Sequence, residues 1–201
     1  VIIGLTGQTG AGKTTAAKCF IEQGIPVIDA DQVSREIVEP GRPTLQKLAE
    51  EFSTSILLPD GRLNRAALAQ IVFSDRVALQ RLNEITHPVI RKQIDALVEK
   101  YQKEGHTMVV VDAPQLFESG ADQMCDRIVA VIASPEIRLQ RIMQRDGISE
   151  EMAKKRIAAQ KREAFFLVHA DYVLENKGNL QFLQWEVSGL IQLLKEIAGE
   201  Q

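Results

Sequence analysis

A glycine-rich segment near the start of the chain constrains its fold most. The run Gly7-Gln-Thr-Gly-Ala-Gly-Lys13-Thr14 matches the pattern G-x-x-x-x-G-K-[ST]. A short apolar run, residues 1–5, predicts a buried strand before it, and helically spaced apolar residues follow from 13 to 23. In this order the elements predict a loop whose backbone amides surround nucleotide phosphates, with Lys13 on the β and γ phosphates. A glycine-rich turn that arose by chance is the alternative.

Short apolar runs and helical patterns alternate through the rest of the chain. Strands are predicted at residues 27–29, 107–112, 127–133 and 172–174. Helical patterns cover 44–52, 64–73, 75–86 and 88–104, and a helix is expected after Ser134. A charged helix is predicted from Ser149 toward Phe166, and a closing helix runs through Leu194. The alternation predicts an α/β, P-loop NTPase-type fold with a doubly wound parallel five-stranded sheet.

The long helical excursion between the second and third strands predicts an inserted subdomain. We expect one domain over residues 1–201, with a core at about 1–39 and 107–201 and a helical insertion at about 40–106. A lid is expected at about 138–166 within the core.

Composition and charge exclude several functional classes. The net charge of -3 gives no general attraction to nucleic acid. No apolar run approaches the roughly 18 residues of a membrane span, and no basic region or cleavage site indicates targeting. The two distant cysteines form no disulfide framework, which favours a reducing, cytoplasmic location. A monomer or a weak homo-oligomer is expected.

Carboxylates at two strand ends are candidates for chemistry. Asp29 and Asp31 lie at the carboxyl end of the second strand, the edge where parallel sheets bind ligands. Asp31 fits a group that orients a hydroxyl and takes its proton, or it caps a helix beginning at Gln32. Asp29 is a turn residue or a Mg²⁺ ligand through water. Asp112 likewise holds Mg²⁺ through water, beside the Thr14 hydroxyl, or serves a capping role.

Three arginines follow the fourth strand at helical spacing. Arg138, Arg141 and Arg145 stand at i, i+3 and i+7, so one helix face carries all three. A lid bearing them would neutralise charge on a transferred group and exclude water. A solvated face with salt bridges is the alternative.

Further motifs in order along nearly the whole chain resemble the dephospho-coenzyme A kinase family. Each motif alone is weak, and their order and spacing carry the resemblance. They are Val27-Ile-Asp-Ala-Asp31 with Arg35 and Pro40-Gly41, Asp60-Gly-Arg-Leu63 with Arg65, Leu68 and Phe73, His87-Pro88, Pro114 with Leu116, Phe117 and Glu118, Arg141 with Arg145, Gln160, and Asp171-Tyr-Val173 before Asn176. Gln115 departs from the Pro-Leu-Leu that the family usually carries at Pro114.

The resemblance implies transfer of the ATP γ-phosphoryl group to the ribose 3′-hydroxyl of dephospho-coenzyme A, with Mg²⁺. It implies three catalytic residues, Asp31 as the base with Lys13 and Arg141. The metal ligands would be Thr14 and Asp112. The ATP-binding residues would be Gly10, Ala11, Gly12, Lys13, Thr14, Thr15, Arg138, Arg145 and Asn176. The acceptor-binding residues would be Thr6, Asp31, Arg35, Arg65, His87, Arg91, Leu116 and Glu118, with a turn role as the alternative for His87.

Two other functions fit a phosphate loop. A nucleoside or nucleotide kinase would keep the same core with another acceptor. A conformational nucleotide switch is disfavoured because no D-x-x-G follows the loop, and Asn176-Lys-Gly-Asn179 lacks the acid of N-K-x-D.

Overall fold

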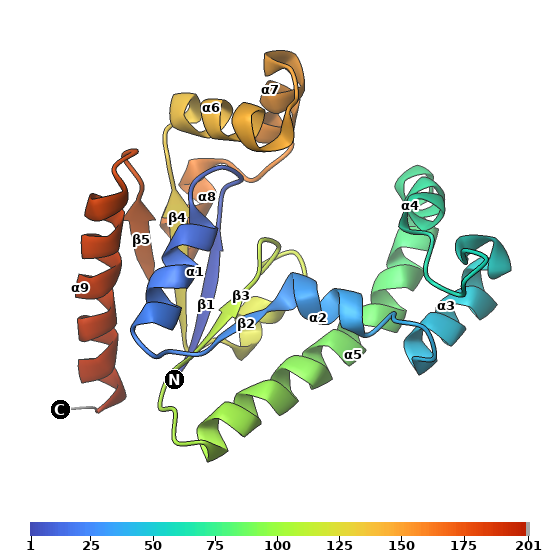
Figure 1. The fold of residues 1–201 in the computed structure, drawn as a ribbon, viewed down its shortest axis with the longest axis horizontal. Helices are drawn as coiled ribbons and strands as arrows, with labels where there is room; N and C mark the ends of the chain where they lie inside the picture. Colours follow the sequence, from blue (N-terminus) through green and yellow to red (C-terminus); the bar gives the residue numbers. More distant parts are fainter. Residues whose placement is uncertain (200–201) are drawn as a thin grey trace. The chain divides into compact units, whose positions relative to one another are not determined.

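The computed structural model describes residues 1–199 and contains one five-stranded sheet in the order β2-β3-β1-β4-β5 (Figure 1). β1 pairs in parallel with β3 and β4, and β4 pairs in parallel with β5. The predicted α/β fold with five parallel strands is confirmed. Because the strands are parallel, their carboxyl ends meet at one edge. The strands are β1 (Ile2–Gly7), β2 (Val27–Asp29), β3 (Val109–Asp112), β4 (Arg127–Ile132) and β5 (Tyr172–Glu175).

Alternating side chains of the strands build an apolar core on each face of the sheet. Ile3, Leu5 and Val131 belong to a buried cluster that includes residues of α1 (Lys13–Glu22) and α9 (Leu180–Ala198). Ala130 and Ile132, one position along β4, instead pack with Phe166 of α8 (Glu163–His169). This period of two is the pattern expected of a sheet covered on both sides.

The helices after β4 differ from the sequence prediction. α6 (Pro135–Asp146) is capped as expected by Ser134, whose Oγ accepts the amide of Ile137 at 3.4 Å. The single helix predicted from Ser149 toward Phe166 is wrong, because α7 (Glu150–Ala158) and α8 are separate. The intervening residues 159–162 contain no glycine or proline. A long-range contact of Gln160, described below, stabilises this break.

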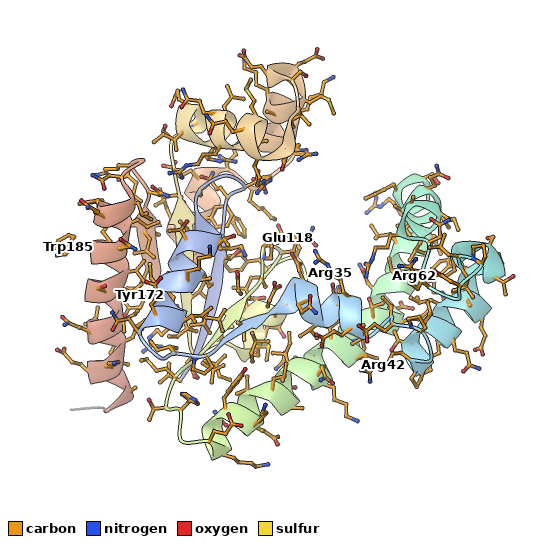
Figure 2. All side chains as sticks on the ribbon, viewed as in Figure 1. Arg35, Arg42, Arg62, Glu118, Tyr172 and Trp185 are labelled. Atoms are coloured by element: carbon orange, nitrogen blue, oxygen red, sulfur yellow. The ribbon has the colours of Figure 1, made fainter. Side chains whose placement is uncertain are left out.

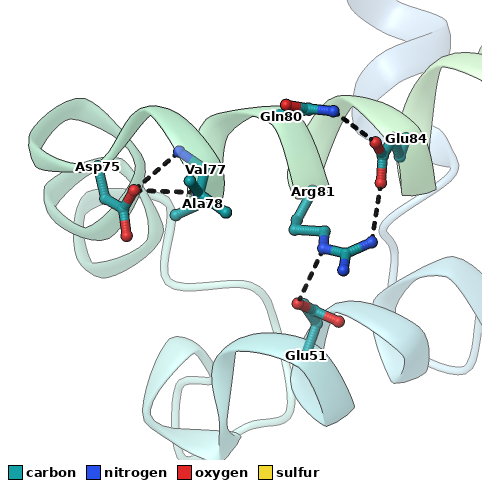
Figure 3. A network of polar contacts seen from close by, with 7 residues as sticks. All are labelled: Glu51, Asp75, Val77, Ala78, Gln80, Arg81 and Glu84. Atoms are coloured by element: carbon teal, nitrogen blue, oxygen red, sulfur yellow. Dashed lines mark hydrogen bonds and ion pairs between the residues drawn. The ribbon is translucent and has the colours of Figure 1, made fainter.

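The chain divides into two compact units, residues 1–28 with 98–201 and residues 29–97, and the sequence had placed the insertion at about 40–106. Within the second unit, Arg81 lies 4.0 Å from Glu51 and 3.1 Å from Glu84 (Figure 3). Asp75 accepts the amide of Val77 at 2.8 Å (Figure 3). The helices that begin in this unit are α2 (Ala30–Glu36), α3 (Pro43–Phe52), the 3-10 helix η1 (Thr54–Ile56), α4 (Arg65–Ser74) and α5 (Arg76–Lys103).

α5 is one continuous helix of 28 residues that contains Pro88. The predicted break between residues 86 and 88 is therefore wrong. Proline removes one ladder hydrogen bond and crowds the preceding turn, at a cost of about 3 kcal/mol. The helix continues past it to Ile94 and Val98, which are 1% and 4% exposed. Burial of such apolar side chains on one helix contributes about 1.5–3 kcal/mol each and offsets that cost.

α5 carries charged side chains on most of its turns, whereas α9 carries only Glu186, Lys195 and Glu196. Among residues 1–199, no helix combines the length and the hydropathy required to cross a membrane.

Candidate active site at the phosphate loop

The phosphate loop, residues 7–14, joins β1 to α1 as the sequence predicted. Gly10 and Gly12 adopt φ of 77° and 105°, a left-handed conformation in which a side chain is strained. Gly12 caps α1 without a side-chain hydrogen bond. The first amides of a helix lack intrahelical partners and lie at the positive end of its dipole. This arrangement is suited to phosphate oxygens.

Lys13 and Asp112 meet at this edge of the sheet. Asp112 ends β3 opposite Leu5 of β1. Its Oδ1 forms an ion pair with the Nζ of Lys13, and the two side chains are only 17% and 12% exposed. Asp112 therefore presents a carboxylate oxygen to Lys13 of the phosphate loop.

Arg138 and Gln160 bond the backbone of the phosphate loop at Thr9. The Nε of Arg138 donates to the Thr9 carbonyl oxygen at 2.9 Å. The Thr9 amide donates to Oε1 of Gln160 at 2.8 Å, and an Arg138 guanidinium nitrogen donates to the same oxygen at 3.1 Å. The three residues thus form a closed hydrogen-bonded triangle.

Arg141 and Asn176 bond the next two carbonyls. Arg141 donates to Gly10 and Ala11 at 3.2 Å each, and to Oδ1 of Asn176 at 3.3 Å. Asn176, 3% exposed after β5, donates to the Ala11 oxygen at 2.7 Å. Arg138, Arg141, Gln160 and Asn176 together are called the loop brace below.

Arg145, the third predicted lid arginine, lies on the exposed end of α6. It contacts both carboxylate oxygens of Asp146 at 2.7 and 2.9 Å. These hydrogen bonds lower the pKa of Asp146, and Arg156 of α7 lowers it further. The ion pair of Asp146 with Arg156 joins α6 to α7. Arg145 has no bond to the phosphate loop among those of the described residues.

Three predicted acceptor-binding residues belong to the first unit. The Thr6 hydroxyl donates to the Pro114 oxygen at 3.3 Å. Leu116 is fully buried, and a Cβ on Gly4 of β1 would lie 2.8 Å from its Cδ2. Glu118 is exposed (Figure 2). Their contact with an acceptor stays a prediction.

Asp31 lies in the first turn of α2, and it does not cap that helix. Oδ1 of Asp29 accepts the amides of Asp31 and Gln32 at 2.8 and 3.0 Å. The helix begins at Ala30, so the capping interpretation of Asp31 is wrong and Asp29 holds that role. Asp31 and Arg35 are exposed and four residues apart, which places them on one helix face.

Comparison with known proteins shows the family of the chain that carries this site. The family model described as dephospho-CoA kinase matches residues 1–181. The chain belongs to the dephospho-CoA kinase family. It is 39% identical over 192 residues to the dephospho-CoA kinase of Bacillus anthracis, covering 96% of each chain.

Solved structures agree with this assignment. The crystal structure of TT1252 from Thermus thermophilus superposes with a TM-score of 0.80 at 34% identity, covering 96% of this chain and 97% of that one. The dephospho-CoA kinase of Campylobacter jejuni gives 0.73 at 29% identity, covering 97% of each chain. The fold predicted for the dephospho-CoA kinase family, with its P-loop NTPase-type core, is thereby confirmed.

The helical unit of this family member carries the remaining predicted acceptor residues. His87 lies on α5 in an open groove of about 700 Å³ with Asn83 and Glu84. Burial lowers its pKa, so the imidazole is neutral at pH 7. It is a mid-helix residue, so its predicted turn role is wrong. Arg91 pairs with Asp95 at 3.3 Å, and Arg65 is exposed at the start of α4.

Gln160 bonds the phosphate loop, a contact that was not predicted from the sequence. Gln160 belongs to the motifs that carried the family resemblance, and this was the only available signal. Thr9, its partner, occupies a variable position of the phosphate-loop pattern. Their contact joins residues 151 positions apart, which no local pattern reveals.

Proposed function

We propose that this chain transfers the γ-phosphoryl group of ATP to the ribose 3′-hydroxyl of dephospho-coenzyme A, forming coenzyme A and ADP, the last step of coenzyme A biosynthesis. The observation that carries the proposal is the family match over residues 1–181, which includes both the phosphate loop and Asp31. A nucleoside or nucleotide acceptor has no comparable support.

ATP binds through the backbone amides of the phosphate loop and the start of α1. Lys13 and the hydroxyl-bearing Thr14 and Thr15 lie on the first turn of that helix. Lys13 exchanges its ion pair with Asp112 for the β and γ phosphates. Arg141 and Arg145 on α6 add positive charge against the transferring group. Arg138 and Asn176 contribute to ATP binding through the loop that they bond.

The residues present fit a magnesium ion. The Thr14 hydroxyl and the Asp112 carboxylate are hard oxygen donors, and both belong to elements that meet at the carboxyl edge of the sheet. Within residues 1–199, no group of three or more His, Cys, Asp or Glu is arranged for a metal. A site with only the Thr14 hydroxyl and the Asp112 carboxylate suits Mg²⁺, because this ion takes its other ligands from water and substrate phosphates. When bound, it would neutralise charge on the phosphates.

The acceptor binds with its hydroxyl against Asp31, which accepts the proton as the oxygen attacks phosphorus. Capping by Asp29 supports this role, because the Asp31 carboxylate is not required by α2. The helical insertion supplies the acceptor contacts Arg35, Arg65, His87 and Arg91, and the core supplies Thr6, Leu116 and Glu118. A neutral His87 in its groove offers a hydrogen bond rather than a charge.

The proposed setting is the cytoplasm, as a monomer or weak homo-oligomer without nucleic-acid or membrane partners. Cys19 and Cys125 are both free thiols, which fits a reducing compartment. Size-exclusion chromatography with light scattering measures the oligomeric state directly.

The test is ADP release with ATP and Mg²⁺, with and without dephospho-coenzyme A, and the product mass. We expect release that depends on the acceptor and yields coenzyme A. Asp31→Asn is expected to lower kcat about 10²–10⁴-fold because the base is lost. Glu99→Gln, which changes an exposed carboxylate on α5, is the matched control. Faster turnover of a nucleotide than of dephospho-coenzyme A would contradict the substrate assignment. A normal rate for Asp31→Asn would contradict the assignment of Asp31 as the base.

A further inference from the structure

Thr9 is the one residue of the phosphate loop that is held by side chains at both its amide and its carbonyl among the bonds of residues 1–199. Gln160 accepts from the amide and Arg138 donates to the carbonyl. The acceptor atom in Gln160 receives two N–H groups, so it must be the amide oxygen. The triangle leaves little rotational freedom at this point of the loop.

Holding Thr9 also orients Gly10. In a trans peptide the carbonyl oxygen and the following N–H point in opposite directions. With Arg138 on the Thr9 oxygen, the Gly10 amide must point away from α6. Gly10 is the first of the predicted ATP-binding residues, and its φ of 77° shows that this peptide takes a conformation that few other residues would adopt.

α6 contacts the loop through backbone as well as through side chains. A Cβ on Gly10 would lie 2.9 Å from the Arg138 carbonyl oxygen and 3.1 Å from its Cα. The Arg138 side chain is itself buried, with the residue 4% exposed. Burying a guanidinium costs free energy unless its hydrogen bonds are met, and here Thr9 and Gln160 accept two of them.

We propose that Arg138 and Gln160 are positioning residues for ATP, which set the phosphate loop for binding through Thr9 without touching the nucleotide. Gln160 lies between α7 and α8, so the same bonds join the segment returning from the predicted lid to the loop. The proposal rests on the proposed function only in taking the phosphate loop as the ATP site.

The decisive comparison is between Gln160→Leu and Gln160→Glu. Leucine removes the acceptor at similar size, while glutamate keeps an oxygen that accepts from both Thr9 and Arg138. We expect Gln160→Leu to raise the Kd and KM for ATP roughly 10-fold, the loss of about one hydrogen bond to a charged group. The KM for dephospho-coenzyme A should stay at its wild-type value, whereas the Tm should fall modestly because the buried Arg138 loses one of its two acceptors. Calorimetric titration with ATP and thermal melting provide the two readouts.

Restoring a hydrogen-bond acceptor at position 160 shows whether Gln160 positions the phosphate loop or only fills space beside it. Gln160→Glu is expected to bind ATP within about twofold of wild type. Gln140→Leu, on the exposed face of α6, is the control for a glutamine lost near the loop. Arg138→Lys keeps the charge but replaces the two nitrogens that bond Thr9 and Gln160 with a single one, so the Kd of this variant for ATP should fall between those of the wild type and Gln160→Leu.

Two outcomes would overturn the proposal. One is an unchanged ATP Kd in Gln160→Leu, and the other is equal weakening by leucine and glutamate. Either result leaves the kinase reaction intact if the wild type still converts dephospho-coenzyme A. A wild-type protein that binds no ATP would overturn the positioning role and the proposed reaction together.

Discussion

Gly12 shows how closely the loop brace fits the phosphate loop. Its φ is 105°, and a Cβ there would lie 2.3 Å from the Asn176 Nδ2. Gly12→Ala must therefore displace Asn176 and weaken its bond to Ala11. We expect weaker ATP binding and a loss of stability beyond the roughly 1–2 kcal/mol of a strained φ, measured by ATP titration and urea unfolding.

Gly24→Ala is the matched control at the residue scale. Gly24 has a positive φ of 77°, and an added Cβ meets nothing within 4 Å. Gly24→Ala should lower the free energy of unfolding only by the cost of placing alanine at a positive φ, and it should leave ATP binding unchanged. If both variants bind ATP equally well, close packing against Asn176 does not shape the loop.

At the element scale, α6 is held to the phosphate loop by Ile142 as well as by arginines. Ile142 is fully buried, and a Cβ on Gly10 would lie 3.1 Å from its Cγ1. Ile142→Ala is expected to cost about 2–5 kcal/mol of stability through the cavity that it leaves. Because α6 positions Arg138 and Arg141, the KM for ATP should rise as well.

Leu194→Ala separates the loss of stability expected for Ile142→Ala from the rise in its KM for ATP. Leu194 is also fully buried, on α9 in the sheet-covering core. Its truncation should cost comparable stability in denaturant unfolding while the KM for ATP stays unchanged. An equal KM shift in both variants would mean that general destabilisation, rather than α6 docking, governs ATP binding.

The elements that the sequence predicted are those with a local signal. The glycine pattern predicts the phosphate loop, and apolar runs predict all five strands. The break after α7 has no such signal, since the contact of Gln160 with Thr9 spans the chain. Pro88, in contrast, predicts a helix break that does not occur, because packing along α5 overrides a strong local helix breaker.

For the candidate site, the sequence predicted which residues lie at the phosphate loop but not which atoms they bond. Lys13, Arg141 and Asn176 were placed at the phosphate loop from motif and resemblance, and the structure brings them together there. That the arginines bond backbone carbonyls is not visible in their spacing. The spacing of Asp29 and Asp31 likewise does not show which of the two caps α2.

For the whole molecule, ATP is expected to stabilise the folded state by mass action. At about 100 times the Kd the gain is about 2.7 kcal/mol, a rise in Tm of roughly 5–10 °C for a chain of this size. Lys13→Ala should lose most of this shift in a thermal melt with Mg²⁺. Lys18→Ala, exposed on the same helix, should keep it. A full shift in Lys13→Ala would contradict the assignment of Lys13 to the phosphates.

The division of the chain into an interrupted unit and a continuous one affects how the protein is made. Residues 29–97 leave the ribosome as one stretch and can collapse at once. β1, by contrast, pairs Ile2 with Val109, so it must wait until more than a hundred further residues have been translated. Gln160 and Asn176 emerge later still. The nucleotide site is therefore completed only after residues 29–97 and most of the sheet have been made, and a prematurely terminated chain that lacks Gln160 and Asn176 would hold a glycine loop without its supports.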